Sequence, residues 1–257
     1  MKSSSPRGSS SHSPRDRGIG LYRDNAVVLR TWKLGESDRI VSLMTQGSGK
    51  VRCVAKGARK TKSRFGSRVE PTNHLEVQLY RGKGELHTLT QVESIDRFPT
   101  LRGDLELFAR ASSLLESVEF VAQDHEPNES LYTMLVRALH TVSSSESHLV
   151  VAGFFLKLLA QEGLSPSLDA CVLCGATTNL THFSILDGGA SCGACRTGFP
   201  ISVDATALLH LALRGQMGAV LNQPPSPATR EFDSLCQRLL EHNLERRLRS
   251  SSVLEQA

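Results

Sequence analysis

The sequence predicts a mixed β and α chain of two domains: an N-terminal five-stranded antiparallel barrel, then an all-α domain that carries a cysteine-rich insert. Three observations predict this architecture. Short strands with alternating apolar residues precede Pro99, the apolar period lengthens to three and four beyond it, and two Cys-x-x-Cys pairs interrupt the helical pattern. With 257 residues, 39% of them hydrophobic, the chain has ample material for two cores.

Five short strands are predicted between Leu21 and Ile95. They cover residues 21–33, 38–46, 50–57, 74–80 and 85–95. Alternation is clearest in 74–80, where Leu75, Val77 and Leu79 face one way. No helix is long enough for a βαβ crossover, so residues 21–98 predict a small barrel. The long connection after the third strand favours an OB-fold, which commonly holds single-stranded nucleic acid, although an SH3-like barrel also has five strands.

Residues 99–249 predict a helical domain. Helices are predicted over residues 107–121, 131–142, 149–159, 202–214 and 226–248. The third of these is apolar nearly all round, which predicts a buried central helix. The last begins at Ser226, a good N-cap, with Pro227 at the first helical position. Cys236 lies on its apolar face and is interpreted as a small core residue.

The two ends of the chain predict no packed structure. Residues 1–20 are mostly Ser, Pro and Arg, which bury too little apolar surface to offset the entropy of ordering, so we expect a disordered tail. Residues 250–257 are expected to form a flexible C-terminus. No apolar run reaches the roughly 18 residues of a membrane helix, and residues 1–20 lack an apolar signal core, which predicts a cytoplasmic protein.

Two cysteine pairs lie in the insert, predicted at residues 168–200. Cys171-x-x-Cys174 is followed after 17 residues by Cys192-x-x-Cys195. Two such pairs suit one tetrahedral Zn²⁺, because each tight turn presents two thiolates from one side, and four thiolates leave no open position. The sequence therefore predicts one structural zinc. A redox dithiol is the competing interpretation, which lacks the βαβ context of thioredoxin-like proteins.

A basic stretch runs from Lys50 to Arg68 and holds eight Lys or Arg without an acid. Residues 21–97 have fifteen Lys or Arg against eight Asp or Glu, a net +7, whereas residues 98–257 have eleven against seventeen, a net −6. This division predicts a barrel that faces nucleic acid. Phe65, beside Arg64, either stacks on a base or plugs the end of the barrel.

The sequence lacks the common catalytic motifs. It has no Walker loop, GxSxG, HExxH or GxGxxG, and its acids are dispersed rather than paired near the basic stretch. We therefore expect a protein that is not an enzyme. An RNA-binding or transcription-associated zinc-ribbon protein is an alternative, and a thiol oxidoreductase is another.

Four runs of the sequence resemble the bacterial RecO family of recombination mediators. They are YRDNAVVLRTWKLGESDRIVSLMT, GKVRCVAKGARKTKSRFGSRVEP, LEVQLYRGKGELHTLTQVE and the CVLCG and CGAC pairs, and the resemblance extends from Leu21 to Leu248. It implies an N-terminal OB-fold, a helical domain and a zinc-binding insert, without catalysis. It also implies binding and annealing of single- and double-stranded DNA.

The resemblance further implies partners, a location and site residues. With RecR, such proteins help to load RecA onto DNA covered by single-stranded DNA-binding protein, whose C-terminal tail is expected on the helical domain, in the nucleoid of the cytoplasm. The DNA-binding residues carried over are Lys50, Arg52, Lys56, Arg59, Lys60, Lys62, Arg64 and Arg68. The metal ligands carried over are Cys171, Cys174, Cys192 and Cys195.

Overall fold

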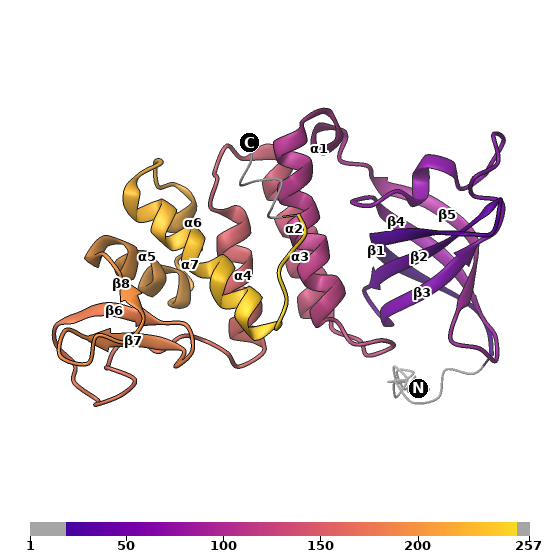
Figure 1. Cartoon of the computed structure of the whole chain (residues 1–257). Helices are drawn as coiled ribbons and strands as arrows, with labels where there is room; N and C mark the ends of the chain where they lie inside the picture. Colours follow the sequence, from indigo (N-terminus) through magenta and orange to yellow (C-terminus); the bar gives the residue numbers. More distant parts are fainter. Residues whose placement is uncertain (1–18, 251–257) are drawn as a thin grey trace, which may run out of the picture.

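The computed structural model describes residues 19–250 as a row of layers, with the barrel at one end and the cysteine insert at the other (Figure 1). The barrel strands are β1 (Gly20–Leu34), β2 (Asp38–Thr45), β3 (Gly49–Ala55), β4 (His74–Arg81) and β5 (His87–Asp96). All five strand predictions are confirmed, because period-two alternation reports which side chains face a core. The predicted tail, 1–20, and C-terminus, 250–257, lie almost wholly outside the described residues.

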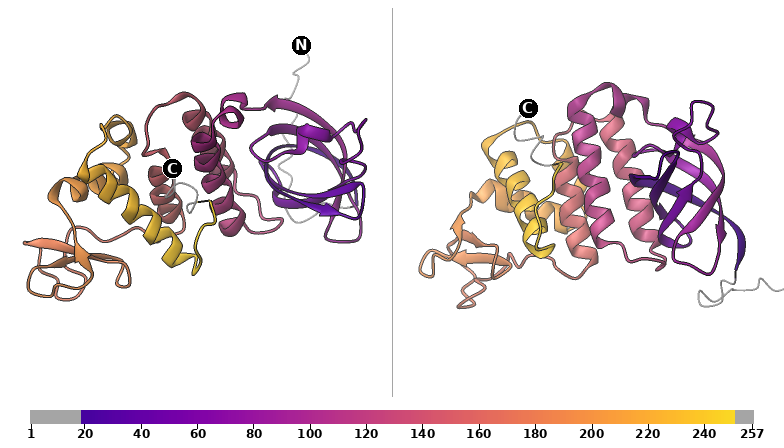
Figure 2. Two further views of the ribbon diagram at one scale, coloured as in Figure 1. Left: turned by 45° about the horizontal axis from the view of Figure 1, so that its top comes forward. Right: turned by 45° about the vertical axis from the view of Figure 1, so that its right-hand side comes forward.

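The strands close into a barrel in the order β1-β2-β3-β5-β4, and one view of Figure 2 looks into it. The prediction of an antiparallel barrel is wrong at one seam, where β3 and β5 pair in parallel through Cys53–His87 and Val54–Thr88. The other four pairings are antiparallel. Directions cannot alternate all the way round a ring with an odd number of strands, so five strands require at least one parallel pair.

A β-bulge in β1 decides which side chains face the barrel core. The register shifts between Val28 and Arg30, which leaves Leu29 as the extra residue. Because strand side chains alternate, one inserted residue moves every later side chain to the opposite face. Val28 packs inside the barrel and Leu29 joins the core of the helical domain, and after the bulge Arg30 pairs with the outward-facing Ser42 instead of pointing inside.

The helical part begins directly after the barrel. Its helices are α1 (Pro99–Gly103), α2 (Leu105–Val121), α3 (Glu129–Ser144), α4 (Val150–Gln161), α5 (Val203–Leu213), α6 (Met217–Leu221) and α7 (Pro227–Asn243). The five predicted helices are confirmed, and the short α1 and α6 were not predicted. Ser226 caps α7 through a capping box with Thr229, which satisfies backbone N–H groups at the helix start.

Helix α7 ends at Asn243, five residues before the predicted Leu248. Glu245 adopts a positive φ of 50°, which turns the chain back towards the helix. This turn buries Leu248 to 2% exposure, and its backbone N–H donates to the Glu241 carboxylate at 3.1 Å. The chain thus buries Leu248 by turning back instead of by continuing the helix. The apolar period of the sequence does not distinguish these two outcomes.

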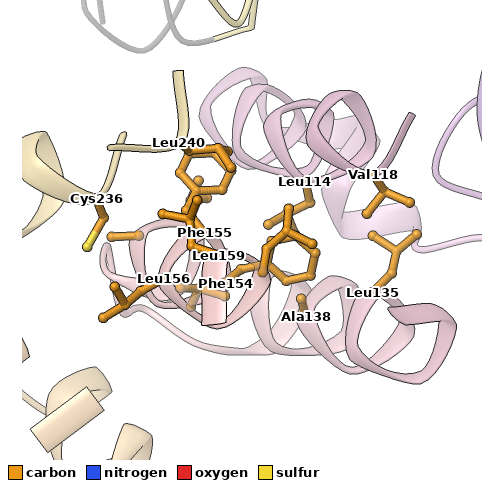
Figure 3. Packing of buried hydrophobic residues seen from close by; sticks show 14 of the residues in the cluster. Leu114, Val118, Leu135, Ala138, Phe154, Phe155, Leu156, Leu159, Cys236 and Leu240 are labelled. Atoms are coloured by element: carbon orange, nitrogen blue, oxygen red, sulfur yellow. The ribbon is translucent and has the colours of Figure 1, made fainter. Parts of the chain in front are cut away.

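The helical core is centred on α4, as its apolar composition predicts. Phe154, Phe155, Leu156 and Leu159 from this helix meet side chains of α2, α3 and α7 (Figure 3). Cys236 of α7 is fully buried in this core, so its interpretation as a core residue is confirmed. In residues 19–250 no helix is long and apolar enough to cross a membrane.

The barrel and the helical domain share one core. Val27, Leu29 and Met44 project outward from the barrel and pack in the cluster of the helices. Gly49, with φ 71°, lets the β2–β3 turn approach the loop after α2 so closely that a Cβ atom there would overlap the Glu126 carbonyl oxygen. The barrel and the helical domain, which Figure 2 shows side by side, are therefore joined by a packed interface.

The cysteine insert departs from the all-α prediction for this domain. It contains a three-stranded sheet in the order β7-β6-β8, formed by β6 (Leu180–Ser184), β7 (Gly189–Cys192) and β8 (Phe199–Pro200). These strands are only two to five residues long, which gives too few positions for an alternation signal. The sheet carries the second cysteine pair towards the first.

Candidate nucleic-acid interface and metal centre

The basic loop connects β3 to β4 and projects from the barrel. Six of the predicted DNA-binding residues have exposed side chains on it, namely Lys56, Arg59, Lys60, Lys62, Arg64 and Arg68. Within the described part of the chain, none of the six forms an ion pair with a carboxylate. Their charges are therefore left to solvent or to a polyanion.

Phe65 anchors this basic loop. Its ring is 1% exposed and packs in the barrel core, and the Arg64 guanidinium lies 4.9 Å from the ring centroid. Of the two roles considered for Phe65, the structure favours the plug. Arg59 also holds the loop, because its guanidinium donates to the carbonyl oxygens of Gly35 at 3.2 Å and Glu36 at 2.9 Å.

Asp38 fastens the start of the basic loop to β2. Its carboxylate accepts from the backbone N–H of Gly57 at 2.7 Å and from the Ser37 hydroxyl at 3.0 Å. The Gly57 N–H, followed by the Ser37 hydroxyl, lowers the pKa of Asp38 because both donors favour the carboxylate. The nearby charges of Lys56 and Lys60 act in the same direction.

Lys50 and Arg52 occupy a different environment from the other six. Lys50 has a side chain only 14% exposed, and its ammonium donates to the Glu119 carbonyl oxygen at 2.9 Å and lies 3.4 Å from the Asp124 carboxylate. Arg52 pairs with Asp124 at 3.2 Å and with Glu85 at 3.8 Å. Both point outward from β3, as predicted, but towards the helical domain. The contact with Asp124 was not visible from sequence.

The uncovered outward face of the barrel carries residues that were not predicted. Trp32 pairs with Ile40, and Ile40 with Val54, so three half-buried side chains form a row across β1, β2 and β3. The Arg30 guanidinium lies 5.1 Å from the Trp32 ring centroid. The bulge at Leu29 puts Trp32 on this face, and simple alternation from Val28 would have placed it inside. The sequence feature that pointed to this face was Trp32 itself, because it is the only tryptophan of the chain.

The four predicted metal ligands lie together. The Sγ atoms of Cys171, Cys174, Cys192 and Cys195 all lie within 4.8 Å of one another. Cys174 Sγ and Cys192 Sγ are 3.7 Å apart, and neither residue is in a disulfide. Four sulfurs around one zinc at the usual bond length of about 2.3 Å would be about 3.8 Å apart. The four positions thus fit a single tetrahedral metal ion.

Two similar turns present these thiols. The residue after each pair adopts a left-handed conformation, Gly175 with φ 76° and Arg196 with φ 51°. Gly175 N–H donates to the Cys171 carbonyl at 2.9 Å, and Arg196 N–H donates to the Cys192 carbonyl at 2.9 Å. Each turn therefore reverses the chain over four residues and directs both sulfurs to the same side.

The electrostatics of the cluster favour a bound cation. Backbone N–H groups of Cys192, Cys174 and Leu173 lower the pKa of Cys171 to about 5. Hydrogen bonds with the side chains of Cys174 and Cys192 raise the pKa of Cys195 to about 12. Full ionisation thus requires a compensating positive charge. His182 lies outside the group of four, with its Nδ1 3.0 Å from the Thr181 hydroxyl.

Comparison with known proteins accounts for both halves of the chain. The family description "Recombination protein O N terminal" matches residues 19–98, and "Recombination protein O C terminal" matches residues 102–252. The chain belongs to the RecO family. The resemblance stated from the sequence is thereby confirmed, and the RecO family is one of DNA repair and recombination.

Relatives named "DNA repair protein RecO" align over almost their whole length. The protein of Streptomyces griseus is 37% identical over 248 residues, which cover 92% of this chain and 100% of the relative. The protein of Frankia casuarinae is 38% identical over 244 residues, covering 92% of this chain and 99% of the relative. That of a Nocardioides species is 38% identical over 244 residues, covering 91% and 99%.

Proposed function

We propose that this protein is a non-enzymatic DNA-binding protein of recombinational repair, which holds single strands on its barrel and anneals them. The observation that carries the proposal is the basic loop, whose six exposed cations have no carboxylate partner among residues 19–250. Neutralising phosphates there would release counterions, which is the main source of sequence-independent affinity. Such affinity suits an annealing protein, because every strand must be accepted.

The barrel is proposed to be of the OB type, with its strand face extending the basic loop. Trp32, Ile40 and Val54 offer a row on which bases could lie, and the Arg30 guanidinium beside the Trp32 ring adds a stacking plane. Phosphates would follow the basic loop while bases cross this row. Of the eight carried-over residues, the six on the loop would contact DNA, and Lys50 and Arg52 would mainly hold the helical domain.

Annealing then follows because bound cations screen the charge repulsion between two DNA strands. Two complementary strands repel through their phosphates, and cations that contact only the backbone lower this repulsion while the base edges stay free to pair. We propose that, together with RecR, the protein uses this activity to help load RecA on strands covered by single-stranded DNA-binding protein. The proposed location is accordingly the nucleoid of the cytoplasm.

A cavity between α3 and α4 suits the acidic, apolar-ended tail of single-stranded DNA-binding protein. It has a volume of about 540 Å³, and Met134, Phe154 and Met217 line it. Arg137 and Lys157 stand at the same cavity and would pair with the acids of the tail. Apolar and basic groups are thus combined in one site on the helical domain.

The metal is proposed to be one structural Zn²⁺ held by Cys171, Cys174, Cys192 and Cys195. Tetrahedral sites of four thiolates are typical of zinc, and a closed site has no position for substrate. Zinc would fix the two turns and their small sheet, which supply few apolar contacts of their own. Its expected role is the stability of the insert.

The experiment that tests the DNA proposal removes charge from the basic loop without touching its anchors. The variant carries Lys56→Gln, Lys60→Gln and Lys62→Gln, and its control loses the same charge from the helical domain through Arg137→Gln, Lys157→Gln and Arg214→Gln. If the three loop lysines contact phosphates of a single strand, the log–log salt slope should fall by about 2 in the variant alone. Annealing of complementary oligonucleotides should slow in parallel.

An equal loss in both variants, or in neither, would refute the assignment of the basic loop. The same titration with RNA of identical length separates the alternative function. Markedly tighter binding of RNA than of single-stranded DNA would favour an RNA-binding protein over a recombination mediator.

A further inference from the structure

We infer that α7 and the residues after it carry a second site for single-stranded DNA, separate from the barrel, which would hold the partner strand during annealing. This inference rests on the proposed function. The site is here called the α7 basic face and consists of Arg230, Arg238, His242, Arg246 and Arg247. All five are exposed.

Helical spacing aligns these residues. Arg238 and His242 are four residues apart, and Arg230 lies eight before Arg238, so the three fall within an arc of about 120° around α7, which also holds Glu231 and Glu241. At 1.5 Å per residue, Arg230 and His242 are separated by about 18 Å along the axis. Arg246 and Arg247 extend the row past the end of the helix. A row of this length spans several phosphates of a single strand.

Three acids, Glu231, Glu241 and Glu245, lie among these basic residues, and backbone N–H groups occupy the first two. Glu231 accepts the backbone N–H of Ser202 at 2.9 Å, and Glu241 accepts that of Leu248 at 3.1 Å. Burial raises the pKa of Asp233 to about 6, although Arg110 opposes this shift. Glu231 and Glu245 are exposed. The face thus holds four arginines and one histidine against three acids, two of which accept backbone N–H groups.

The guanidinium groups of the α7 basic face are available to a phosphate. Among the described residues, no ion pair to a carboxylate is made by Arg230, Arg238, Arg246 or Arg247. This separates them from Lys50 and Arg52, which lie against Asp124. In this respect these arginines resemble the six exposed cations of the basic loop, which also form no ion pair with a carboxylate among the described residues.

Two adjoining hollows lie along the face. One, of about 430 Å³, is lined by Phe199, Arg230, Glu231 and Arg238. The other, of about 410 Å³, is lined by Arg238, His242, Arg246 and Arg247 together with Glu241, Glu245 and Ile185. Arg238 lines both, so the two hollows meet at this residue.

Aromatic rings hold two of the guanidinium groups in place. Arg238 lies 4.3 Å from the centroid of Phe199, and Arg246 lies 4.7 Å from that of Phe120. A guanidinium plane supported by a ring on one side can stack on a base with the other. Basic groups interleaved with rings in a groove are the combination that single-stranded nucleic acid requires.

The position of α7 suits a second strand. Figure 1 shows α2, α3 and α4 between helix α7 itself and the barrel, whereas the chain after α7 runs back along α2. A strand on each surface would let one chain hold two strands and screen both. This explains how a domain with a net charge of −6 could take part in annealing.

Native mass spectrometry can count strands on each chain, using two non-complementary oligonucleotides of different mass. The wild-type chain should bind both. A variant with Arg230→Gln, Arg238→Gln and Arg247→Gln should keep the first strand and bind the second roughly tenfold or more weakly, the scale expected on losing three phosphate contacts. Annealing should slow, whereas the matched Arg→Lys variant should retain the second strand.

Several results would overturn the inference. These are two strands bound by the Gln variant as by wild type, or only one strand bound by wild type. Loss of the second strand with an equal fall in melting temperature would assign the arginines a structural role. Displacement of the second strand by polyglutamate at the same charge concentration would assign the face to an acidic protein. Loss of the first strand occurs instead when the basic loop is changed, so failure of the proposed function is distinguishable.

Discussion

Replacing Lys50 with methionine tests whether this residue binds DNA or holds the two domains together. The side chain is 14% exposed and makes two charged contacts with the helical domain, at 2.9 Å to the Glu119 carbonyl and 3.4 Å to Asp124. Hydrogen bonds to charged groups contribute about 1.5–3 kcal/mol each, and Asp124 keeps Arg52 as a partner. Lys50→Met should therefore lower the free energy of unfolding by about 2 kcal/mol.

The assay combines unfolding with DNA titration. Urea unfolding is followed by the fluorescence of Trp32, the only tryptophan, which reports on the barrel. Lys60→Met is the matched control, because Lys60 is exposed and unpaired in the basic loop. It should leave unfolding within about 0.5 kcal/mol of wild type and lower the salt slope by about 0.7. A Lys50→Met protein with unchanged stability and a salt slope reduced by this amount would refute the interface role.

Three further predictions concern the barrel and the metal centre. Phe65→Ala should lower the free energy of unfolding by about 3–5 kcal/mol, because it leaves a cavity at a buried site. Phe65→Leu should retain the DNA affinity. A stable Leu variant that had lost DNA affinity would instead show that the Phe65 ring stacks on a base. Burial, with His125 and Arg81, lowers the pKa of His87 to about 4, so the folded state binds fewer protons than the unfolded state between about pH 6.5 and 4. Stability should fall as pH drops through that window, and His87→Asn should flatten the fall in denaturation curves measured across it. Cys171→Ser with Cys174→Ser should lower the metal content measured by atomic emission from one to none per chain and lower the melting temperature, whereas binding of the first DNA strand should persist.

Short-range patterns were enough to predict much of this fold. The strands and main helices follow from periods of two and three to four, and the capping of α7 follows from Ser226 and Pro227. The pairing of cysteines within each Cys-x-x-Cys turn also follows from local spacing, whereas the small sheet of the insert brings the two pairs together. These features depend on residues close in sequence, whose geometry the backbone restricts.

Features that join distant segments required the tertiary structure. The parallel β3–β5 seam comes from ring closure, and the outward position of Trp32 comes from a bulge that composition does not mark. The burial of Phe65 resolved an alternative that its neighbours in sequence had left open. Each outcome depends on what lies across a strand pair or at the end of a barrel.

The sequence by itself determined that the barrel half is basic and the helical half acidic. Only the tertiary structure decided which charges are free. Lys50 meets Asp124, more than 70 residues away, while the acids beside Arg238 turn to backbone donors and leave that arginine exposed. The energy of a charge depends on its solvation and on groups within a few ångströms, and packing brings those groups together from distant parts of the chain.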